Sequence, residues 1–157
     1  MKIQLIVIGK TTQDFVRLGL NEFSERLKHY LPFEIEVIPE LKNTKNFSAE
    51  QQKGKEGECL LKSFQQGDYI VLLDEKGKEM SSMQFAEYLE KKKQVVYKRL
   101  VFVIGGAYGF SPNVYETAHE KIALSQMTFS HQLTRLIFIE QLYRAMTIIN
   151  HEPYHHE

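Results

Sequence analysis

The chain has 157 residues, of which 43% are hydrophobic and 25% are charged, a size and composition typical of one soluble globular domain. Its 20 basic and 20 acidic residues give a net charge of zero. Attraction to phosphate supplies most non-specific affinity for nucleic acids, so this balance gives no support to a broadly basic RNA-binding protein. Any RNA contact would need a local patch or a patch borrowed from a second subunit.

The cysteine content and the apolar runs bear on the compartment. The single cysteine, Cys59, excludes an intramolecular disulfide and suits a reducing environment. The apolar run at residues 3–8 is too short for the core of a signal peptide. The longest uncharged stretch, residues 100–115, contains three glycines and a proline and is not expected to span a membrane. We therefore expect a cytoplasmic protein.

The first third of the chain predicts two strands and the helix between them. Residues 3–8 form a β-branched run typical of a buried strand. Apolar residues then recur at helical spacing from Phe15 to Tyr30, which predicts an amphipathic helix that Pro32 ends. Residues 33–38 alternate with period two, as expected of a half-buried strand near an edge of the sheet.

The middle of the chain predicts two helices around a third strand. After a polar loop at residues 41–47, Ser48 and Gln51 have the spacing of a capping box, and the helix is expected to run to about residue 64. Residues 69–74 predict a strand that ends in a charged loop at residues 75–78. Ser81 and Gln84 then start another helix.

The last third begins with the most hydrophobic strand, residues 100–104, which is followed by a glycine turn at residues 105–109. Ser111 and Pro112 start a short helix that is expected to end near residue 121. Residues 122–129 predict a strand or an ordered loop, and a final helix covers about residues 131–149. This alternation of strands and helices predicts one α/β domain over residues 1–157, with a mainly parallel sheet flanked by helices.

The final helix is apolar around most of its circumference. Such a helix must be buried on every side, whereas the terminal helix of a small domain usually keeps one face in water. A second copy of the chain packed on this helix would bury that face, and this interpretation favours a homodimer. The alternative is a helix that lies centrally within one chain.

Ligands bind beyond the carboxyl ends of the strands in an open parallel sheet. Three segments of this chain are expected at that place: Leu73-Asp74, the glycine turn at residues 105–109, and residues 124–129. The Gly-Gly-x-x-Gly spacing is neither a dinucleotide fingerprint nor a Walker phosphate loop. The turn could bring backbone close to a ligand, or it could be only a tight connection.

The C-terminal segment and two arginines are further candidates. Residues 150–157 contain three histidines and two acids, but a flexible terminus holds metal ligands poorly and no metal site is expected. Pro153 could instead direct Tyr154 and His155 toward a substrate. Arg135 and Arg144 lie on nearly opposite sides of the final helix. Arg144 could bind phosphate in a cleft or could pair with Glu140 one turn away.

Four segments in this order resemble one known family over essentially the full length of the chain. They are FVIGGAYGFS at residues 102–111, LSQMTFSHQLTR at residues 124–135, EQLYRA at residues 140–145 and PYH at residues 153–155. The chain resembles the ribosomal RNA large subunit methyltransferase H family. One departure is Ser130, which stands where the family pattern has proline.

The resemblance implies a SPOUT-type α/β fold with a C-terminal trefoil knot, and a homodimer without a separate RNA-binding domain. It implies S-adenosylmethionine as the methyl donor and methylation of N3 of a pseudouridine in a stem-loop of 23S rRNA on the assembled ribosome. Carried over by motif, the substrate-side residues are Arg144, Tyr154 and His155, brought to the donor across the dimer interface. The implied cofactor-binding residues are Leu73, Gly105, Leu124, Ser125, Gln126, Met127, Thr128 and Phe129.

The implied chemistry needs an aligned methyl group and a nitrogen that has lost its proton. Arg144 could stabilise the developing anion and His155 could act as the base. Two alternatives remain: a non-catalytic protein that docks on the ribosome, and an enzyme that acts on a free nucleotide or a small metabolite. Lysines 42, 45, 53 and 55 could contact RNA phosphates, but they are also typical of a solvated face.

Overall fold

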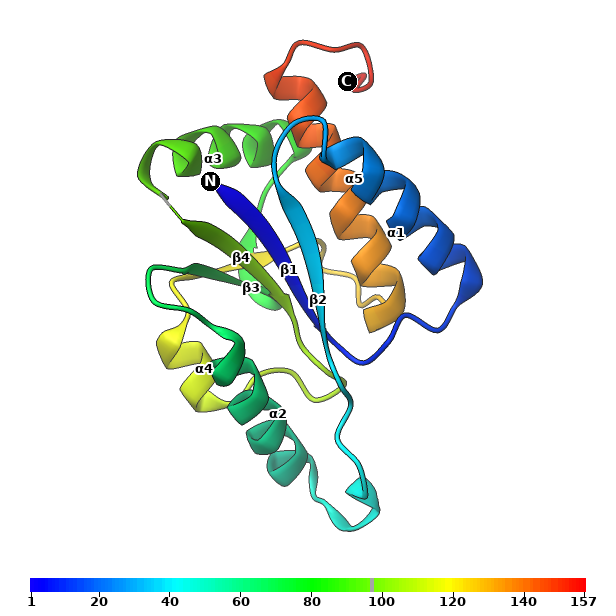
Figure 1. The fold of residues 1–157 in the computed structure, drawn as a ribbon, viewed down its shortest axis with the longest axis vertical. Helices are drawn as coiled ribbons and strands as arrows, with labels where there is room; N and C mark the ends of the chain where they lie inside the picture. The colour runs from blue at the N-terminus through cyan, green and yellow to red at the C-terminus, as the bar shows by residue number, and fades with distance from the viewer. Residues whose placement is uncertain (97) are drawn as a thin grey trace.

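Five parallel strands form a sheet in the order β2-β1-β4-β3-β5 in the computed structural model, which describes residues 1–96 and 98–157 (Figure 1). The order shows that the chain crosses the sheet repeatedly, as expected when helices connect parallel strands. The elements are β1 (Lys2–Ile8), α1 (Asp14–Leu27), β2 (Phe33–Ile38), the 3-10 turn η1 (Thr44–Asn46), α2 (Ala49–Ser63), β3 (Tyr69–Glu79), α3 (Ser82–Val95), β4 (Arg99–Ile104), α4 (Pro112–Thr117), β5 (Glu120–Ala123) and α5 (His131–Ile149).

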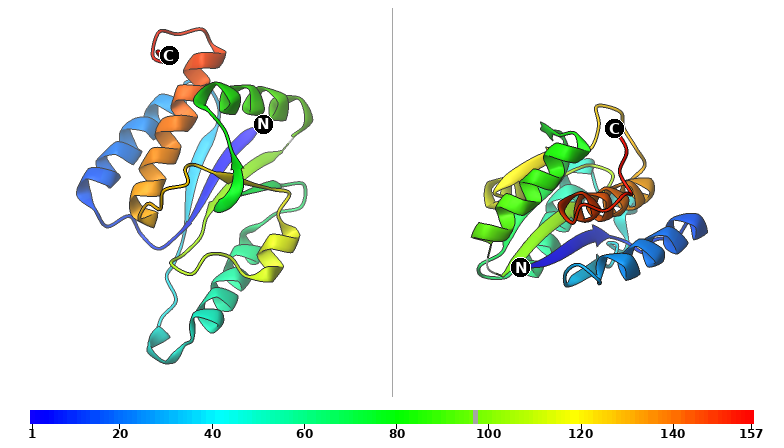
Figure 2. Two further views of the ribbon diagram at one scale, coloured as in Figure 1. Left: turned by 180° about the vertical axis from the view of Figure 1, so that it is seen from behind. Right: turned by 90° about the horizontal axis from the view of Figure 1, so that it is seen from above.

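The sheet lies between two layers of helices (Figures 1 and 2). Helices α1, α3 and α5 cover one face, where Ile3, Leu5 and Val7 of β1 contribute to the larger apolar core. Helices α2 and α4 cover the other face, where Ile6 and Ile8 join a smaller core. Alternate side chains of β1 therefore enter the two cores, which explains why the sequence of β1 is apolar without interruption.

The expected strands and helices are present, and the capping boxes at Ser48 and Ser81 start α2 and α3. The interpretation of residues 75–78 as a charged loop was wrong, because β3 continues to Glu79. The expected end of α4 near residue 121 was also wrong, since the helix ends at Thr117 and β5 follows. Both differences have the same cause: β5 pairs with the two halves of β3 across a shift in register.

The chain between α4 and β5 is fixed to β3 by His119. Its backbone N–H donates to the carbonyl of Ile70 at 2.8 Å, and its Nδ1 accepts from the N–H of Ile70 at 3.0 Å. Because these two hydrogen bonds hold His119 beside β3, the chain does not continue α4 beyond Thr117. A local helical pattern cannot reveal such a contact, because the partner lies 49 residues away.

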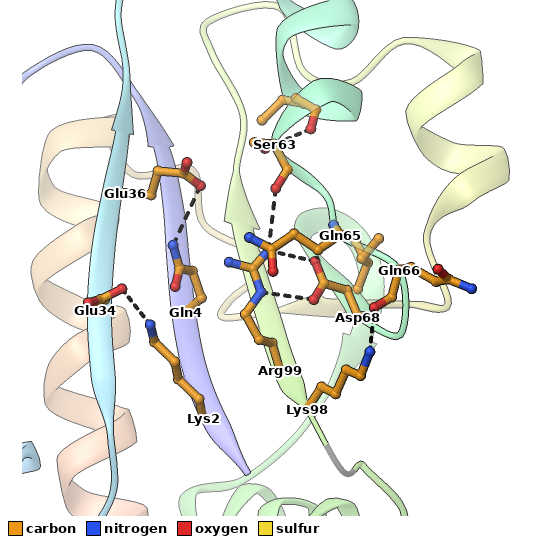
Figure 3. A network of polar contacts seen from close by, with 12 residues as sticks. Lys2, Gln4, Glu34, Glu36, Ser63, Gln65, Gln66, Asp68, Lys98 and Arg99 are labelled. Carbon is orange, nitrogen blue, oxygen red and sulfur yellow. Dashed lines mark hydrogen bonds and ion pairs between the residues drawn. The ribbon is translucent and has the colours of Figure 1, made fainter.

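The amino half of the α2/α4 face carries polar side chains (Figure 3). Lys2 Nζ lies 2.6 Å from Glu34 Oε2, which joins β1 to the edge strand β2. Arg99 forms a two-pronged contact with Asp68, with Nε 2.8 Å from Oδ1 and Nη2 2.6 Å from Oδ2, and Nη2 also reaches the carbonyl of Ser63. These contacts tie the start of β4 to the turn before β3 and to the end of α2.

Helix α5 packs against both α1 and α3 on its face of the sheet. Its buried residues include Phe138, Leu142 and Met146, whereas Leu133 and Tyr143 are half-buried. Part of its apolar surface is therefore satisfied within one chain. The dimer expected from the apolar character of this helix stays a prediction.

Candidate functional site: a cavity at the carboxyl ends of β3 and β4

A cavity of about 680 Å³ opens where β3 and β4 end. The three segments expected at this edge of the sheet meet around it: the end of β3, the glycine turn after β4, and the loop between β5 and α5. Its size is within the range of roughly 300–1,000 Å³ typical of small-molecule sites. The cavity is the principal candidate for ligand binding in the part of the chain that the structure describes.

The residues that the family resemblance assigned to the cofactor gather at this cavity, with one exception. Gln126 is exposed and is not part of the lining. Its neighbours in the loop turn toward the cavity instead. The assigned residues in the lining are Leu73, Gly105, Leu124, Ser125, Met127, Thr128 and Phe129.

The glycine turn is narrow, and the backbone itself forms part of the wall. The N–H of Gly109 donates to the carbonyl of Gly106 at 3.1 Å, and these two residues also form an isolated antiparallel bridge. Gly109 has a φ of +79°, a conformation that favours glycine. Residues 105–111 are called the glycine corner below. The corner is a tight connection and at the same time brings backbone to the cavity.

The middle of β3, just beyond its last pairing with β4 at Leu73, supplies carboxylates to the cavity wall. Asp74 accepts hydrogen bonds from the backbone N–H of Lys76 at 2.8 Å and from the hydroxyl of Tyr115. Burial, and then the hydrogen bond to Asp74, raise the pKa of Tyr115 to about 12. Tyr115 therefore stays a neutral hydrogen-bond donor that holds Asp74 in place. No periodic pattern or motif in the sequence pointed to Tyr115, which the fold brings to the cavity from α4.

The loop before α5 is held at several points. The hydroxyl of Thr128 donates to Glu75 Oε1 at 3.0 Å, which links the loop to β3. Ser125 Oγ accepts from the N–H of Met127 at 2.9 Å. Ser130 caps α5 by accepting from the N–H of Leu133 at 3.2 Å, so the residue that departs from the family pattern provides a normal helix start. Glu75 was expected in a loop, and its place in the cavity wall was not foreseen.

The three expected substrate-side residues form a second cluster together with Glu140. Arg144 pairs with Glu140 at 2.6 Å, the partner that the spacing on the helix suggested. The hydroxyl of Tyr154 donates to the same carboxylate at 3.1 Å, and the guanidinium of Arg144 lies 4.8 Å from the centre of the Tyr154 ring. Arg144 Nη1 lies 3.1 Å from Nδ1 of His155. The tail after α5 is thus packed rather than frayed.

This Arg144 cluster does not line the cavity of its own chain. Thr134, near the start of α5, lies in the cavity wall, and Arg144 follows ten residues later, about 15 Å along the helix axis. Figure 1 shows α5 running back toward the amino ends of the strands, where the chain terminus lies. Within one chain the two expected halves of the site are therefore separate.

Arg135 lies near the cavity but is almost fully buried, at 1% exposure. Its Nη1 donates to Thr11 Oγ1 at 2.9 Å and its Nη2 donates to the carbonyl of Ile8 at 2.8 Å. Burial lowers the pKa of this guanidinium, and the charge of Glu40 opposes that effect. Arg135 ties α5 to the end of β1.

The described residues contain neither a cluster suited to a metal ion nor a helix suited to crossing a membrane. Among residues 1–96 and 98–157, no three or more histidine, cysteine or acidic side chains gather in a way that could hold a metal ion. No helix in the same residues is long and apolar enough to cross a membrane.

Comparison with known proteins identifies the family. A family model described as "Predicted SPOUT methyltransferase" matches residues 1–155. Proteins named "Ribosomal RNA large subunit methyltransferase H" are similar over the full length of both chains. The one from Parabacteroides distasonis is 68% identical, and those from Phocaeicola vulgatus and Bacteroides fragilis are each 60% identical. The chain belongs to the SPOUT methyltransferase family, whose α/β fold carries the C-terminal trefoil knot.

Proposed function

We propose that this chain transfers a methyl group from S-adenosylmethionine to N3 of a pseudouridine in a stem-loop of 23S rRNA, on the assembled ribosome in the cytoplasm. Full-length similarity to proteins named ribosomal RNA large subunit methyltransferase H supports the rRNA substrate. The observation that carries the proposal is the cavity, because the three segments that resemble the family's donor site meet there.

The residues present fit the donor. The backbone of Gly105 and the loop at residues 124–129 would hold it against Leu73. S-adenosylmethionine supplies a methyl group on a positively charged sulfur, which becomes a neutral thioether after transfer. Asp74 and Glu75 place carboxylates in the cavity wall, and Lys53 and Lys76 of the same wall offset their formal charge. An aligned methyl group needs little further activation from the protein.

The substrate side is proposed to come from a second copy of the chain. The Arg144 cluster lies too far along α5 to reach the cavity of its own chain, so the partner subunit's Arg144 would have to supply it. Helix α1, which packs beside α5, exposes 59% of Phe15 and 68% of Leu18 on one helical face. Two large apolar side chains left in water next to α5 support a homodimer on this side of the molecule.

The contacts within the cluster support a proposed role for each of its members. Glu140 holds Arg144 through two nitrogens, at 3.0 Å from Nε and 2.6 Å from Nη2, so the guanidinium is oriented before substrate arrives. The guanidinium can then stabilise the anion that forms as the pseudouridine N3 loses its proton. Tyr154 braces the same carboxylate through its hydroxyl.

The contact with Arg144 determines which ring nitrogen of His155 carries the proton. A guanidinium can only donate, so Nδ1 of His155 accepts from Arg144, and a neutral ring then carries its proton on Nε2. Nε2 is buried and has no hydrogen-bond partner in the described residues, and Glu157 Oε1 lies 4.0 Å from it. In this arrangement the ring offers a donor to the substrate. For His155 to serve as the base, its contact with Arg144 has to break first.

Three assays test the proposal. Isothermal titration with S-adenosylmethionine separates an enzyme from a docking module, which would give no heat. Methyl transfer to intact ribosomes, isolated rRNA and nucleosides separates the ribosomal substrate from a small metabolite. Mass spectrometry of rRNA from cells that lack the protein is decisive, because an unchanged pattern of pseudouridine methylation would contradict the proposed function.

A further inference from the structure

The glycine corner is supported from behind by two consecutive residues of α2. A methyl group added to Gly57 would lie 2.3 Å from Ser111 Oγ, so the helix backbone touches the end of the corner. A methyl group added to Gly106 would lie 2.7 Å from Oε1 and 2.8 Å from Oε2 of Glu56, so the carboxyl group fills the space where a side chain would be. Helix α2 thus places a carboxyl group directly against Gly106.

The Glu56 carboxyl is buried without sufficient hydrogen bonds. Only 6% of the residue is exposed, and Oε1 has no hydrogen-bond partner in the described residues. A buried carboxylate oxygen without a donor costs free energy. Such an oxygen marks a place where the fold alone does not complete the local electrostatics.

The Glu56 carboxyl forms no ion pair in the part of the chain that the structure describes, although Lys53 of the same helix lies in the cavity wall. Lys53 on the same helix pairs with Glu50 at 3.0 Å, and Lys55 lies over the ring of Phe47. The charged residue acting on Glu56 from another segment is Glu40, which is itself acidic. Burial raises the pKa of the Glu56 carboxyl, Glu40 acts in the same direction, and a hydrogen bond from Gln52 opposes them.

Gly106 lines the cavity on its other side. With no side chain at this position, only the backbone separates the Glu56 carboxyl from the cavity. Through a thin, low-dielectric wall, an unpaired charge acts more strongly than it would through water. The ligand proposed for the cavity is a cation before methyl transfer and carries a neutral sulfur afterwards.

We propose that Glu56 is a specificity-determining residue of the donor site: its carboxylate behind Gly106 favours the positively charged sulfur of S-adenosylmethionine over the neutral sulfur of the product, S-adenosylhomocysteine. This inference rests on the proposed function. A residue of α2 would then distinguish S-adenosylmethionine from S-adenosylhomocysteine, and the weaker binding of the product would assist its release. Asp74 and Glu75 face the same cavity but already accept hydrogen bonds.

The test is isothermal titration of the whole protein with each of the two ligands. Glu56→Gln keeps the shape of the side chain and removes its charge. We expect the affinity for S-adenosylmethionine to fall about tenfold, as for a unit charge acting through a partly polar environment, and the affinity for S-adenosylhomocysteine to stay unchanged. The matched control is Glu58→Gln, which removes a charge from an exposed position on the same helix and should alter neither affinity.

A second measurement on the unmodified protein does not depend on how the variant folds. The ratio of the two affinities should decrease as the pH is lowered through the raised pKa of Glu56, because protonation removes the charge. The ratio in Glu56→Gln should vary less over the same range, because the other ionisable groups of the cavity wall are the same in both proteins: Lys53, Asp74, Glu75, Lys76 and His131. The variant Glu40→Gln tests separately the acidic residue that acts on Glu56.

The outcomes separate the two proposals. If Glu56→Gln weakens both ligands equally, the residue only supports the corner and the inference is wrong. If neither affinity changes, the charge has no role and the inference is wrong as well. If the unmodified protein binds neither ligand, the proposed function itself fails, independently of Glu56.

Discussion

Buried acidic residues at the two ends of the sheet differ in how fully they are hydrogen-bonded. At the amino end, the buried Asp68 and the half-buried Arg99 satisfy each other through two short contacts (Figure 3). At the carboxyl end, Glu56 is equally buried but keeps an oxygen without a partner, behind the glycine corner. A satisfied pair fixes the fold, whereas an unsatisfied group leaves binding capacity for a ligand. The difference indicates that the Asp68–Arg99 pair stabilises the fold, whereas the region behind the glycine corner keeps capacity to interact with a ligand.

The largest effect should come from breaking the pair at the amino end. Asp68→Ala leaves Arg99 largely buried without its partner, so the free energy of unfolding should fall by about 3–5 kcal/mol. Chemical denaturation measures this value. Lys2→Ala removes an exposed pair from the same network and should cost under about 1 kcal/mol. Equal losses in the two variants would contradict the distinction between buried and exposed pairs.

Arg144→Ala tests the part of the site that is proposed to come from the partner subunit. Methyl transfer should fall about 100-fold, because a cationic group that stabilises the developing anion is lost. Titration with S-adenosylmethionine should give unchanged affinity, since Arg144 does not line the cavity. An equal loss of donor affinity would place Arg144 in the donor site instead of on the substrate side.

Gly106→Ala tests the glycine corner. The added methyl group would meet the Glu56 carboxyl at 2.7 Å, so either this carboxyl group or the corner has to move. Donor affinity should fall about tenfold, the loss expected from displaced backbone contacts worth about 1.4 kcal/mol. Gly54→Ala is the control, because nothing lies near an added methyl group there and the helix should gain up to about 1 kcal/mol. Unchanged affinity in Gly106→Ala would mean that the corner does not shape the donor site.

The smallest expected effect concerns stability and pH. Folding raises the pKa of Glu56 above its value in the unfolded chain, so the native state loses stability as pH rises from the unfolded pKa through the folded pKa. Glu56→Gln removes this loss and should be more stable than the unmodified protein by about 1 kcal/mol above that range. Thermal unfolding at several pH values checks this prediction. A variant that is less stable at neutral pH would show that the charge is compensated after all.

Most of the elements and the location of the cavity followed from the sequence. The apolar runs of β1 and β4 and the capping residues of α2 and α3 are local signals, and local physical chemistry determines them. The rule that ligands bind beyond the carboxyl ends of parallel strands then brought Leu73, Gly105 and the loop at residues 124–129 together. The four motifs directed the interpretation to this family, although the charge balance gave no support to RNA binding.

Tertiary structure alone decided the features that depend on distant partners. The extension of β3 and the early end of α4 arise from pairing with β5, which no local pattern encodes. Tyr115 reaches Asp74 from 41 residues away, and Glu56 meets Gly106 because α2 packs behind the corner. Residue types and their spacing determine which elements form, but the burial and pairing of a charged group depend on which elements pack around it.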